Sequence, residues 1–264
     1  MKRIGNLYEK VCSIENLQLA DEKARKGKLR TYGVIEHDKK REVNLLKLRE
    51  TLLNGTFHTS KYDVFTIYEP KEREIYRLPY FPDRILHHAI MNVLEPIWVS
   101  TFTADTYSCI KNRGIHAAAK KVKQALREDP EGTTFCLKLD IRKFYPSINH
   151  DVLKSILRRK LKDKRLLRLL DEIIDSADGV PIGNYLSQYF ANLYLTYFDH
   201  WIKEQKRVKH YFRYADDIVI LASDKSYLHS LMGEIRAYLG DLKLEVKGNW
   251  QVFPVAARGI DFVG

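Results

Sequence analysis

The sequence predicts an α+β fold, in which antiparallel strand pairs combine with amphipathic helices, and three observations lead to this prediction. Residues 210–221 contain two strand-like runs on either side of a polar bend, as in a β-hairpin. Residues 63–68 and 74–78 form a second strand pair around a turn that contains proline. From residue 190 to 202, apolar side chains recur at the spacing of an amphipathic helix. Strand pairs and helices of this kind are the parts of an α+β domain.

The composition is that of a globular protein with a strongly basic surface. The chain has 264 residues, enough for one large domain or two small ones, and 45% of them are hydrophobic. The formal net charge is +11 at pH 7 and the isoelectric point is near 9.4. A basic surface attracts polyanions, so the charge favours a nucleic-acid partner, although a basic chain can also simply be soluble.

Cysteine usage and hydropathy exclude several classes of protein. The three cysteines, Cys12, Cys109 and Cys136, form no CxxC pair, which argues against a disulfide framework and against a zinc site. The sequence has no apolar run of about 18 residues and no signal-peptide pattern, so we expect no membrane partner. We therefore expect a protein of the reducing cytoplasm.

The polar bend of the 210–221 hairpin carries two adjacent carboxylates, Asp216 and Asp217. Two like charges a few Å apart do not both stay ionised without a counterion, and hard divalent cations prefer oxygen ligands. A metal site on a rigid β-turn is therefore one interpretation of this bend. The other interpretation is a solvated hairpin tip without function, because short motifs often match by chance.

A third carboxylate, Asp140, ends the strand that we predict at residues 134–141. A lone carboxylate at a strand end is usually a cap or a salt-bridge partner. If Asp140 meets the bend at Asp216 and Asp217 in space, the three carboxylates form a cluster. Such a cluster holds two divalent ions about 3.5–4 Å apart in enzymes that carry out in-line displacement at phosphorus. One ion activates the attacking 3′-hydroxyl, and the other neutralises charge on the triphosphate and the leaving pyrophosphate.

Two basic segments offer contacts to a polyanion. The turn and second strand of the predicted 63–78 strand pair carry Lys71, Arg73 and Arg77, which can clamp phosphates or simply decorate a surface hairpin. A cationic helix expected at residues 151–170 can contact a nucleic-acid backbone or present a solvated face. The sequence leaves both pairs of alternatives open.

A loop and a helix complete the set of candidate features. In the loop 179–188, backbone freedom at Gly183 lets a flat ligand approach closely. We expect Asp83 to cap the N-terminus of an amphipathic helix that follows it. His87 and His88 lie off the apolar stripe of that helix and do not face one another, so we expect them to be structural or RNA-facing rather than a metal pair.

Four of these stretches occur in the order in which they occur in reverse transcriptases. The chain resembles these enzymes in residues 139–145 (LDIRKFY), in the Gly-x-x-x-Ser loop that begins at Gly183, in residues 214–217 (YADD) and in residues 258–262 (RGIDF). The resemblance covers the chain from about residue 60 to its end. It implies the fingers and palm of the right-hand polymerase fold, with an antiparallel palm sheet backed by helices.

The resemblance also implies a division of the chain. Residues 1–60 are expected to be a helical N-terminal extension, residues 61–134 the fingers, and residues 135–264 the palm. The palm is expected to end in a hairpin that resembles the primer grip, with Arg258, Gly259 and Ile260. Reverse transcriptases continue into a helical thumb, and because no such segment follows here, we expect the thumb to be missing from this sequence.

For the active site, the resemblance implies that Asp140 and Asp216 are the principal ligands of two Mg²⁺ ions, or of Mn²⁺, with Asp217 beside them and Ile141 contributing. Tyr145 stands where these enzymes keep a bulky ring against the 2′ position of the sugar, which rejects ribonucleotides by steric clash. The other positions implied at the nucleotide are Lys71, Arg73, Arg77, Phe144, Ile182, Gly183, Ser187 and Gln188. The sequence does not decide which fingers arginine contacts the triphosphate.

Two stretches are similar to the reverse transcriptases of diversity-generating retroelements in particular. Ile182 stands where most relatives have a hydrogen-bonding glutamine, and residues 81–89 (FPDRILHHA) also match this group. The resemblance implies error-prone copying of a dedicated template RNA, with mutations concentrated at adenines, and a small basic accessory protein as partner. Loss of a polar contact near the nascent base pair narrows the free-energy gap between right and wrong nucleotides, and about 1.4 kcal/mol corresponds to tenfold discrimination.

On this interpretation the chain copies a template RNA from a DNA or RNA primer, with deoxynucleoside triphosphates as substrates. Two alternatives remain open. One is a reverse transcriptase of the group II intron or phage-defence type, and the other is a non-catalytic RNA-binding fragment that lacks the thumb. The three carboxylates and Tyr145 argue against lost chemistry, whereas the missing thumb argues for it.

Overall fold

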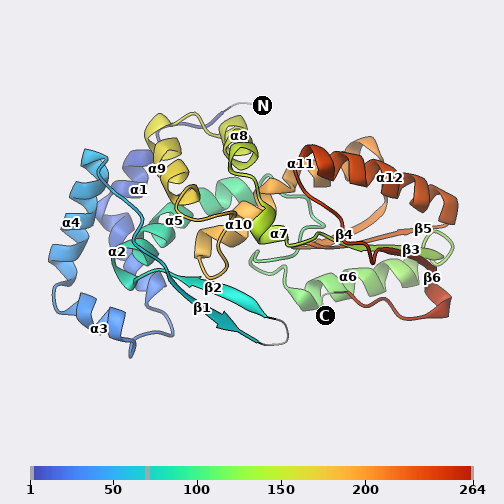
Figure 1. The fold of residues 1–264 in the computed structure, drawn as a ribbon, viewed down its shortest axis with the longest axis horizontal. Helices are drawn as coiled ribbons and strands as arrows, with labels where there is room; N and C mark the ends of the chain where they lie inside the picture. Colours follow the sequence, from blue (N-terminus) through green and yellow to red (C-terminus); the bar gives the residue numbers. More distant parts are fainter. Residues whose placement is uncertain (1–2, 69–71, 263–264) are drawn as a thin grey trace. The chain divides into compact units, whose positions relative to one another are not determined.

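The computed structural model describes residues 3–68 and 72–262, which Figure 1 shows as a ribbon. The chain forms two compact units, one of residues 1–100 with 153–190 and the other of residues 101–152 with 191–264. The predicted divisions after residues 60 and 134 do not coincide with these units, because the chain crosses between the units three times. The assignment of fingers and palm therefore stays a prediction. Lys71 lies outside the described residues.

The first unit is mainly helical and carries a two-stranded ribbon. The strands pair antiparallel, with Asp63 opposite Arg77 and Ile67 opposite Arg73, which confirms the predicted strand pair. The elements that lie wholly or mostly in this unit are α1 (Tyr8–Cys12), α2 (Ile14–Ala24), α3 (Tyr32–Asp38), α4 (Arg41–Asn54), β1 (Asp63–Ile67), β2 (Arg73–Arg77), η1 (Tyr80–Arg84), α5 (Ile85–Val99), α8 (His150–Lys160), α9 (Lys164–Ile174) and α10 (Tyr185–Tyr194).

A buried carboxylate, Asp21 of α2, holds the N-terminal helices together. It accepts hydrogen bonds from Arg25 at 2.7 Å, from Arg41 at 2.6 Å and from the hydroxyl of Tyr80 at 2.5 Å. Burial alone would raise the pKa of Asp21, but hydrogen bonds from His37, Tyr80 and the two arginines lower it below its ordinary value. Asp21 therefore stays ionised and joins α2 to α4 and η1.

Two predicted helices differ from the observed ones. Asp83 caps no helix: it lies inside η1, is fully buried, and accepts a hydrogen bond from the backbone N–H of Ser60 at 3.0 Å. The single helix expected at residues 151–170 is two helices, α8 and α9. The reason is Asp163, whose carboxylate accepts the N–H of Leu166 and so begins a new helix in the middle of the cationic run.

The helix expected at residues 190–202 is also interrupted. It is divided among the end of α10, α11 (Thr196–His200) and the π-helix η2 (Trp201–Gln205). The interruption falls at Leu195, where the hydroxyl of the next residue, Thr196, donates to the carbonyl of Asn192 at 3.0 Å. Such bonds from Ser or Thr to a carbonyl four residues earlier bend helices.

The second unit contains a four-stranded antiparallel sheet in the order β4-β5-β3-β6. The strand predicted at residues 134–141 and the hairpin predicted at residues 210–221 are both present in it. The further elements and the strands of this unit are α6 (Ile115–Glu128), β3 (Phe135–Asp140), α7 (Phe144–Ser147), β4 (His210–Tyr214), β5 (Asp217–Ala222), α12 (Lys225–Asp241), β6 (Gln251–Pro254) and η3 (Val255–Ala257).

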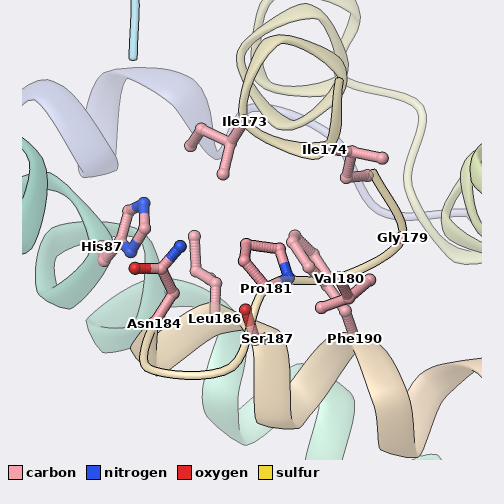
Figure 2. A pocket seen from close by; sticks show the side chains of 10 residues that line it. All are labelled: His87, Ile173, Ile174, Gly179, Val180, Pro181, Asn184, Leu186, Ser187 and Phe190. Carbon is pink, nitrogen blue, oxygen red and sulfur yellow. The ribbon is translucent and has the colours of Figure 1, made fainter. Parts of the chain in front are cut away.

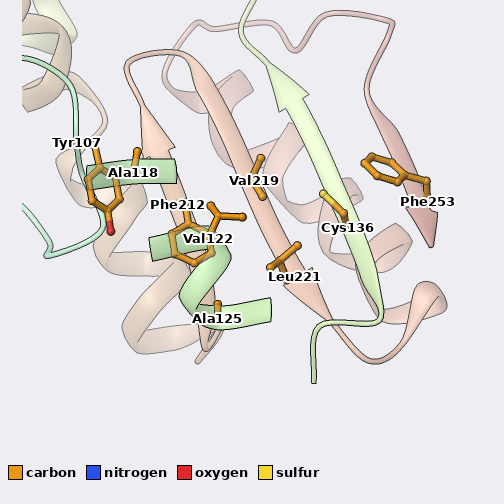
Figure 3. Packing of buried hydrophobic residues seen from close by; sticks show 9 residues of the cluster. All are labelled: Tyr107, Ala118, Val122, Ala125, Cys136, Phe212, Val219, Leu221 and Phe253. Carbon is orange, nitrogen blue, oxygen red and sulfur yellow. The ribbon is translucent and has the colours of Figure 1, made fainter. Parts of the chain in front are cut away.

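Helices cover both faces of this sheet (Figure 1). On one face, Cys136, Phe212 and Val219 pack against Ala118 and Val122 of α6 (Figure 3). The alternate strand residues point to the opposite face, on which α12 lies. The antiparallel sheet backed by helices is therefore confirmed.

The predicted last hairpin is wrong in the described residues. β6 does not pair with residues 258–262, which form no strand, but with β3, where Pro254 lies opposite Phe135. Proline has no backbone N–H, and the chain turns into η3 directly after it. Arg258, Gly259 and Ile260 therefore lie in an irregular segment rather than in a strand.

Two expectations from composition can be compared with the structure. Cys12, Cys109 and Cys136 are free thiols, in agreement with the expectation that no disulfide forms. Within the described residues, no helix combines the length and the apolar character that crossing a membrane requires.

Candidate active site

Two carboxylates that lie far apart in the sequence meet at one edge of the sheet. Asp140 is the last residue of β3, and Asp216 lies in the turn between β4 and β5. Burial, the negative charge of Asp140 and a hydrogen bond to Asp140 together raise the pKa of Asp216. Asp217 lies directly opposite Asp140 in the β3–β5 register. The structure thus brings together the strand end and the acidic bend that the sequence singled out.

Lys247 supplies a positive charge to this pair. Its Nζ donates to Oδ2 of Asp140 at 2.5 Å, and its backbone N–H donates to the carbonyl of Asp140 at 2.8 Å. The neighbouring Ile141 forms an isolated antiparallel bridge with Val246. Lys247 is about one-third exposed, at 35% of its side chain, so it is a partner that an incoming cation can displace.

Among residues 3–68 and 72–262, no three His, Cys, Asp or Glu side chains are arranged to hold a metal ion as they stand. Asp140 binds Lys247. The predicted cluster of Asp140, Asp216 and Asp217 therefore stays a prediction. The pair of Asp140 and Asp216 nevertheless fits a hard divalent cation, because its ligand atoms are oxygens. In addition, the buried Oδ1 of Asp140 has no hydrogen-bond partner in the described chain.

The turn that carries Asp216 has a fixed backbone. Ala215 has a φ of 53°, in the left-handed region that non-glycine residues rarely adopt. Its carbonyl accepts a hydrogen bond at 3.0 Å from Nη1 of Arg213, which stabilises this conformation. The position of Asp216 therefore depends on where Arg213 is held.

Arg213 is held by a buried ion pair with Asp199 of α11. Both side chains are fully buried, and the contact is bidentate: Nε donates to Oδ1 at 2.7 Å and Nη2 to Oδ2 at 2.6 Å. The same carboxylate accepts the hydroxyls of Thr106 at 2.9 Å and Tyr211 at 2.5 Å. Asn192 accepts the remaining bond from Nη1 at 3.2 Å. All the charge of the pair is thus satisfied by partners on four segments.

Tyr145 lies close to the carboxylate pair. Burial and then the negative charges of Cys109 and Asp216 raise the pKa of its hydroxyl. Its ring meets the ring of Phe144 edge-on, with centroids 5.6 Å apart, and Phe144, a position implied at the nucleotide, is buried. The structure therefore places the predicted sugar-facing ring beside the acidic bend.

In the first unit, the loop before α10 is bonded to the two-stranded ribbon. The carbonyl of Ile182 accepts the backbone N–H of Tyr76 at 2.8 Å. Gly183 has a φ of 118°, and a Cβ atom there would lie 2.7 Å from the carbonyl oxygen of Tyr76. Only glycine fits this close approach, so the backbone freedom predicted at Gly183 serves contact with β2.

The helical end of the same loop lines a small cavity. Figure 2 shows His87, Asn184 and Ser187 around it, and its volume of about 10 Å³ is near the lower limit for one water molecule. His87 is buried, and burial together with nearby positive charge lowers its pKa to about 3, so the ring is neutral. Ser187 is buried in this cavity, whereas Gln188 is exposed.

The other predicted nucleotide and primer residues differ in their surroundings. Arg77 forms an ion pair with Asp63 across the ribbon, whereas Arg73 is exposed and has no ion-pair partner in the part of the chain that is described. Arg258 lies over the ring of Phe253, with 3.8 Å from its guanidinium carbon to the ring centroid. Ile260 packs against the core cluster of Figure 3.

Comparison with known proteins identifies the family. Residues 69–264 match the family model described as reverse transcriptase (RNA-dependent DNA polymerase). The chain is a member of the reverse transcriptase family. The retroelement subtype does not follow from this match, because relatives of the family with other roles are similar to the chain as well.

Three curated relatives show that members of the family with different names are similar to this chain. Protein YkfC of Escherichia coli is 26% identical over 84% of this chain and 70% of its own length. The group II intron-encoded protein LtrA of Lactococcus lactis is 23% identical over 67% of this chain. The mitochondrial nuclear intron maturase 4 of Arabidopsis thaliana is 27% identical over 58% of this chain. The chain spans only 31% of the length of LtrA and 20% of the maturase.

Solved structures agree on the fold. Apo telomerase from Candida tropicalis, truncated from its C-terminal domain, superposes with a TM-score of 0.54 at 13% identity, over 79% of this chain and 53% of the telomerase chain. At this identity the likeness concerns the fold alone. It supports the α+β assignment with the antiparallel sheet of reverse transcriptases.

Sequence reasoning missed three residues that position the acidic bend. Lys247, Asp199 and Arg213 were not predicted as part of the site, although each contacts it directly or through one bond. For Arg213 a signal was available, because a lone cation in an otherwise apolar strand flank needs a buried partner. For Lys247, which stands among polar residues, the sequence holds no comparable signal. Asp199 is a lone carboxylate in the apolar stretch 190–202, which was the corresponding sign of a buried partner.

We expect Asp216→Asn to stabilise the metal-free protein, because it removes one of two neighbouring like charges that are both half-buried. The gain should be roughly 1–3 kcal/mol at neutral pH and should vanish on acidification, since the raised pKa means that Asp216 takes up a proton as the pH falls. Addition of Mg²⁺ should raise the melting temperature of the wild type but not of this variant. Asp261→Asn is the control, because it removes an exposed carboxylate that pairs with Lys138. If Mg²⁺ stabilises Asp216→Asn as much as the wild type, the metal site is contradicted.

We expect Asp199→Asn to destabilise the protein by about 3–5 kcal/mol, because it leaves the guanidinium of Arg213 buried without its counter-charge. Urea denaturation measures this cost. Glu245→Gln removes an exposed ion pair with Arg142 in the same unit and should cost less than about 1 kcal/mol. Similar costs for the two variants would show that the buried pair has no special role.

Proposed function

We propose that this chain is an RNA-directed DNA polymerase, which copies a template RNA into cDNA from a primer by two-metal nucleotidyl transfer. The observation that carries the proposal is the contact between Asp140 and Asp216 at the edge of an antiparallel sheet, in a chain of the reverse transcriptase family. Paired carboxylates with an unsatisfied buried oxygen are suited to Mg²⁺ or Mn²⁺. Template RNA, a DNA or RNA primer and deoxynucleoside triphosphates are the proposed partners.

Asp140 and Asp216 are proposed as the residues that hold the metal, with Asp217 and the backbone at Ile141 beside them. When bound, Mg²⁺ activates the attacking 3′-hydroxyl and neutralises charge on the leaving pyrophosphate. The protein's own contribution is placement. Arg213 fixes the turn that carries Asp216, and Lys247 keeps Asp140 extended along the sheet edge until a cation takes its place.

Tyr145 is proposed as the residue that rejects ribonucleotides. A half-buried ring beside Asp216 is already in place to clash with a 2′-hydroxyl, so selection by clash costs little reorganisation. Phe144 packs behind it and limits its rotation. Between the two fingers arginines, Arg73 is the better candidate for the triphosphate, because Arg77 is already paired with Asp63.

For the subtype we propose the error-prone enzyme of a diversity-generating retroelement, with a dedicated template RNA and a small basic accessory protein. The apolar Ile182 supports it, because its side chain offers no hydrogen bond. A group II intron or maturase type of function is the second candidate, favoured by the similarity to LtrA and to the nuclear intron maturase. A template repeat beside the gene would favour the retroelement.

The polymerase proposal predicts primer extension that depends on the carboxylate pair. With Mg²⁺, an RNA template and a DNA primer, the wild type should extend the primer, and Asp140→Asn or Asp216→Asn should each reduce the rate at least about a hundredfold. Glu128→Gln, at an exposed carboxylate at the end of α6, is the control and should leave the rate unchanged. If the wild type binds template RNA but extends no primer, the non-catalytic alternative holds.

The retroelement proposal predicts that fidelity depends on residue 182. Ile182→Gln adds a polar contact and should lower misincorporation at template adenines by roughly tenfold, while the backbone bond from Tyr76 is retained. Sequencing of the cDNA measures this. Ile182→Leu keeps the apolar character and serves as the matched control. Unchanged adenine errors in Ile182→Gln would refute this explanation of error-prone copying.

A further inference from the structure

One face of η1 and α5 gathers positive charge, and it includes His88, for which the sequence left an RNA-facing role open. Arg84, His88 and Asn92 follow one another at four-residue spacing and therefore line one face of the helix. Lys23, near the end of α2, reaches this face, because its Nζ donates to Oδ1 of Asn92 at 2.6 Å. Lys28 lies in the turn that follows α2. We refer to Lys23, Lys28, Arg84 and His88 as the cationic cluster.

The members of the cationic cluster are close enough to act on one another. Burial and then the charges of Lys28, Lys23 and Arg84 lower the pKa of His88 to about 4, so its ring is neutral at physiological pH. Burial and Arg84 likewise lower the pKa of Lys28, and burial and Arg77 lower the pKa of Arg84. Burial lowers the pKa of any cation, but the charge effects of Lys23, Lys28 and Arg84 on their neighbours in the cluster are also repulsive, so positive potential gathers here.

No carboxylate of residues 3–68 or 72–262 lies within ion-pair distance of Lys23, Lys28 or Arg84. Elsewhere in the same unit, a partly buried arginine has such a partner, as Arg25 has in Asp21 at 2.7 Å. Arg84 is half-buried, and its Nε donates only to a backbone carbonyl, that of residue 78, at 3.1 Å. A half-buried guanidinium without a counter-charge costs free energy that a bound anion recovers.

Aromatic rings adjoin the cations. The ring of His88 stacks on the ring of Tyr185, with centroids 4.6 Å apart and an interplanar angle of 23°. The cluster is also elongated, because Lys23 lies at Asn92, which is separated from Arg84 by two helical turns, about 12 Å at 1.5 Å per residue. A row of cations beside stacked rings suits a single nucleic-acid strand better than one compact anion.

We propose that the cationic cluster binds a backbone phosphate of single-stranded RNA, with the guanidinium of Arg84 and the ammonium of Lys28 as its donors. The neutral ring of His88 and the ring of Tyr185 form the wall beside that phosphate. This site is separate from the residues proposed for catalysis and for the triphosphate. That the anion is RNA rests on the proposed function, whereas the existence of an anion site rests on the charges alone.

The test measures binding of a short fluorescein-labelled single-stranded RNA by anisotropy over a series of salt concentrations, in EDTA and without nucleotides. Lys28→Ala and Arg84→Gln should each weaken binding roughly threefold or more and reduce the salt slope by about 0.7, the value for one lost phosphate contact on a single strand. Lys26→Ala is the matched control, because Lys26 is exposed in the same turn and carries the same charge. It should change neither quantity.

Two further measurements identify the anion and guard against a misfolded variant. Binding of a deoxynucleoside triphosphate is measured on the same proteins and should not depend on Lys28. In phosphate-free buffer, Lys28→Ala should melt slightly above the wild type, because it relieves repulsion with Arg84, whereas Lys26→Ala should not. Since Lys28 is exposed and makes no side-chain hydrogen bond in the described chain, this variant should fold normally.

Each outcome decides the proposal. If Lys28→Ala weakens binding of the triphosphate and not of RNA, the cluster serves the nucleotide and the RNA site is refuted. If Lys28→Ala and Lys26→Ala behave alike in every measurement, there is no anion site at all. RNA binding is measured without catalysis, so a chain that binds RNA through the cluster but extends no primer would refute the polymerase and leave this site intact.

Discussion

The geometry of the acidic edge depends on the buried ion pair between Asp199 and Arg213. Two opposite charges removed from water are stable only when every donor and acceptor is satisfied, and here Thr106, Tyr211 and Asn192 complete the set. Because these partners come from different segments of the chain, the pair has one arrangement. The turn that follows is fixed by the same pair, because Arg213 donates one hydrogen bond to the carbonyl of Ala215. The placement of Asp216 is therefore decided by an ion pair that is itself fully buried.

The treatment of charge distinguishes structural from functional regions in this chain. Where charges only hold the fold, as at Asp21, each one has partners within hydrogen-bond distance. Where we infer binding, the balance is incomplete: two carboxylates share one lysine at the sheet edge, and Lys28 and Arg84 share no carboxylate in the described residues. Incomplete compensation raises the free energy of the unbound protein, so a ligand of the opposite charge binds with a corresponding gain. The same physical argument thus leads to a cation site in one unit and an anion site in the other.

The sequence predicted the parts of this structure that depend on local pattern. The strand ends at Asp140 and Asp217 and the two-stranded ribbon follow from alternation and turn residues, and they are as expected. The helix break at Asp163 was missed. The residues on both sides of Asp163 favour a helix, and Asp163 starts a new helix as its N-cap only where tertiary contacts fix its position. The pairing of β6 with β3 could not be read from neighbouring residues at all, since strand partners are chosen by long-range packing. The role of Lys247 depends on the same long-range contact.

Lys247 contacts Asp140 twice, once through its backbone and once through its ammonium group. Such a tethered counter-ion cannot diffuse away, so its local concentration at the carboxylate is far higher than that of any free salt. A divalent cation that binds Asp140 has to displace the ammonium group of Lys247. The presence of this group therefore lowers the apparent affinity of the carboxylate for the cation. An ion that arrives already complexed to a polyphosphate brings additional contacts and overcomes the lysine more easily. In the proposed polymerase, the tethered lysine would thereby link metal occupancy of the acidic edge to the arrival of substrate.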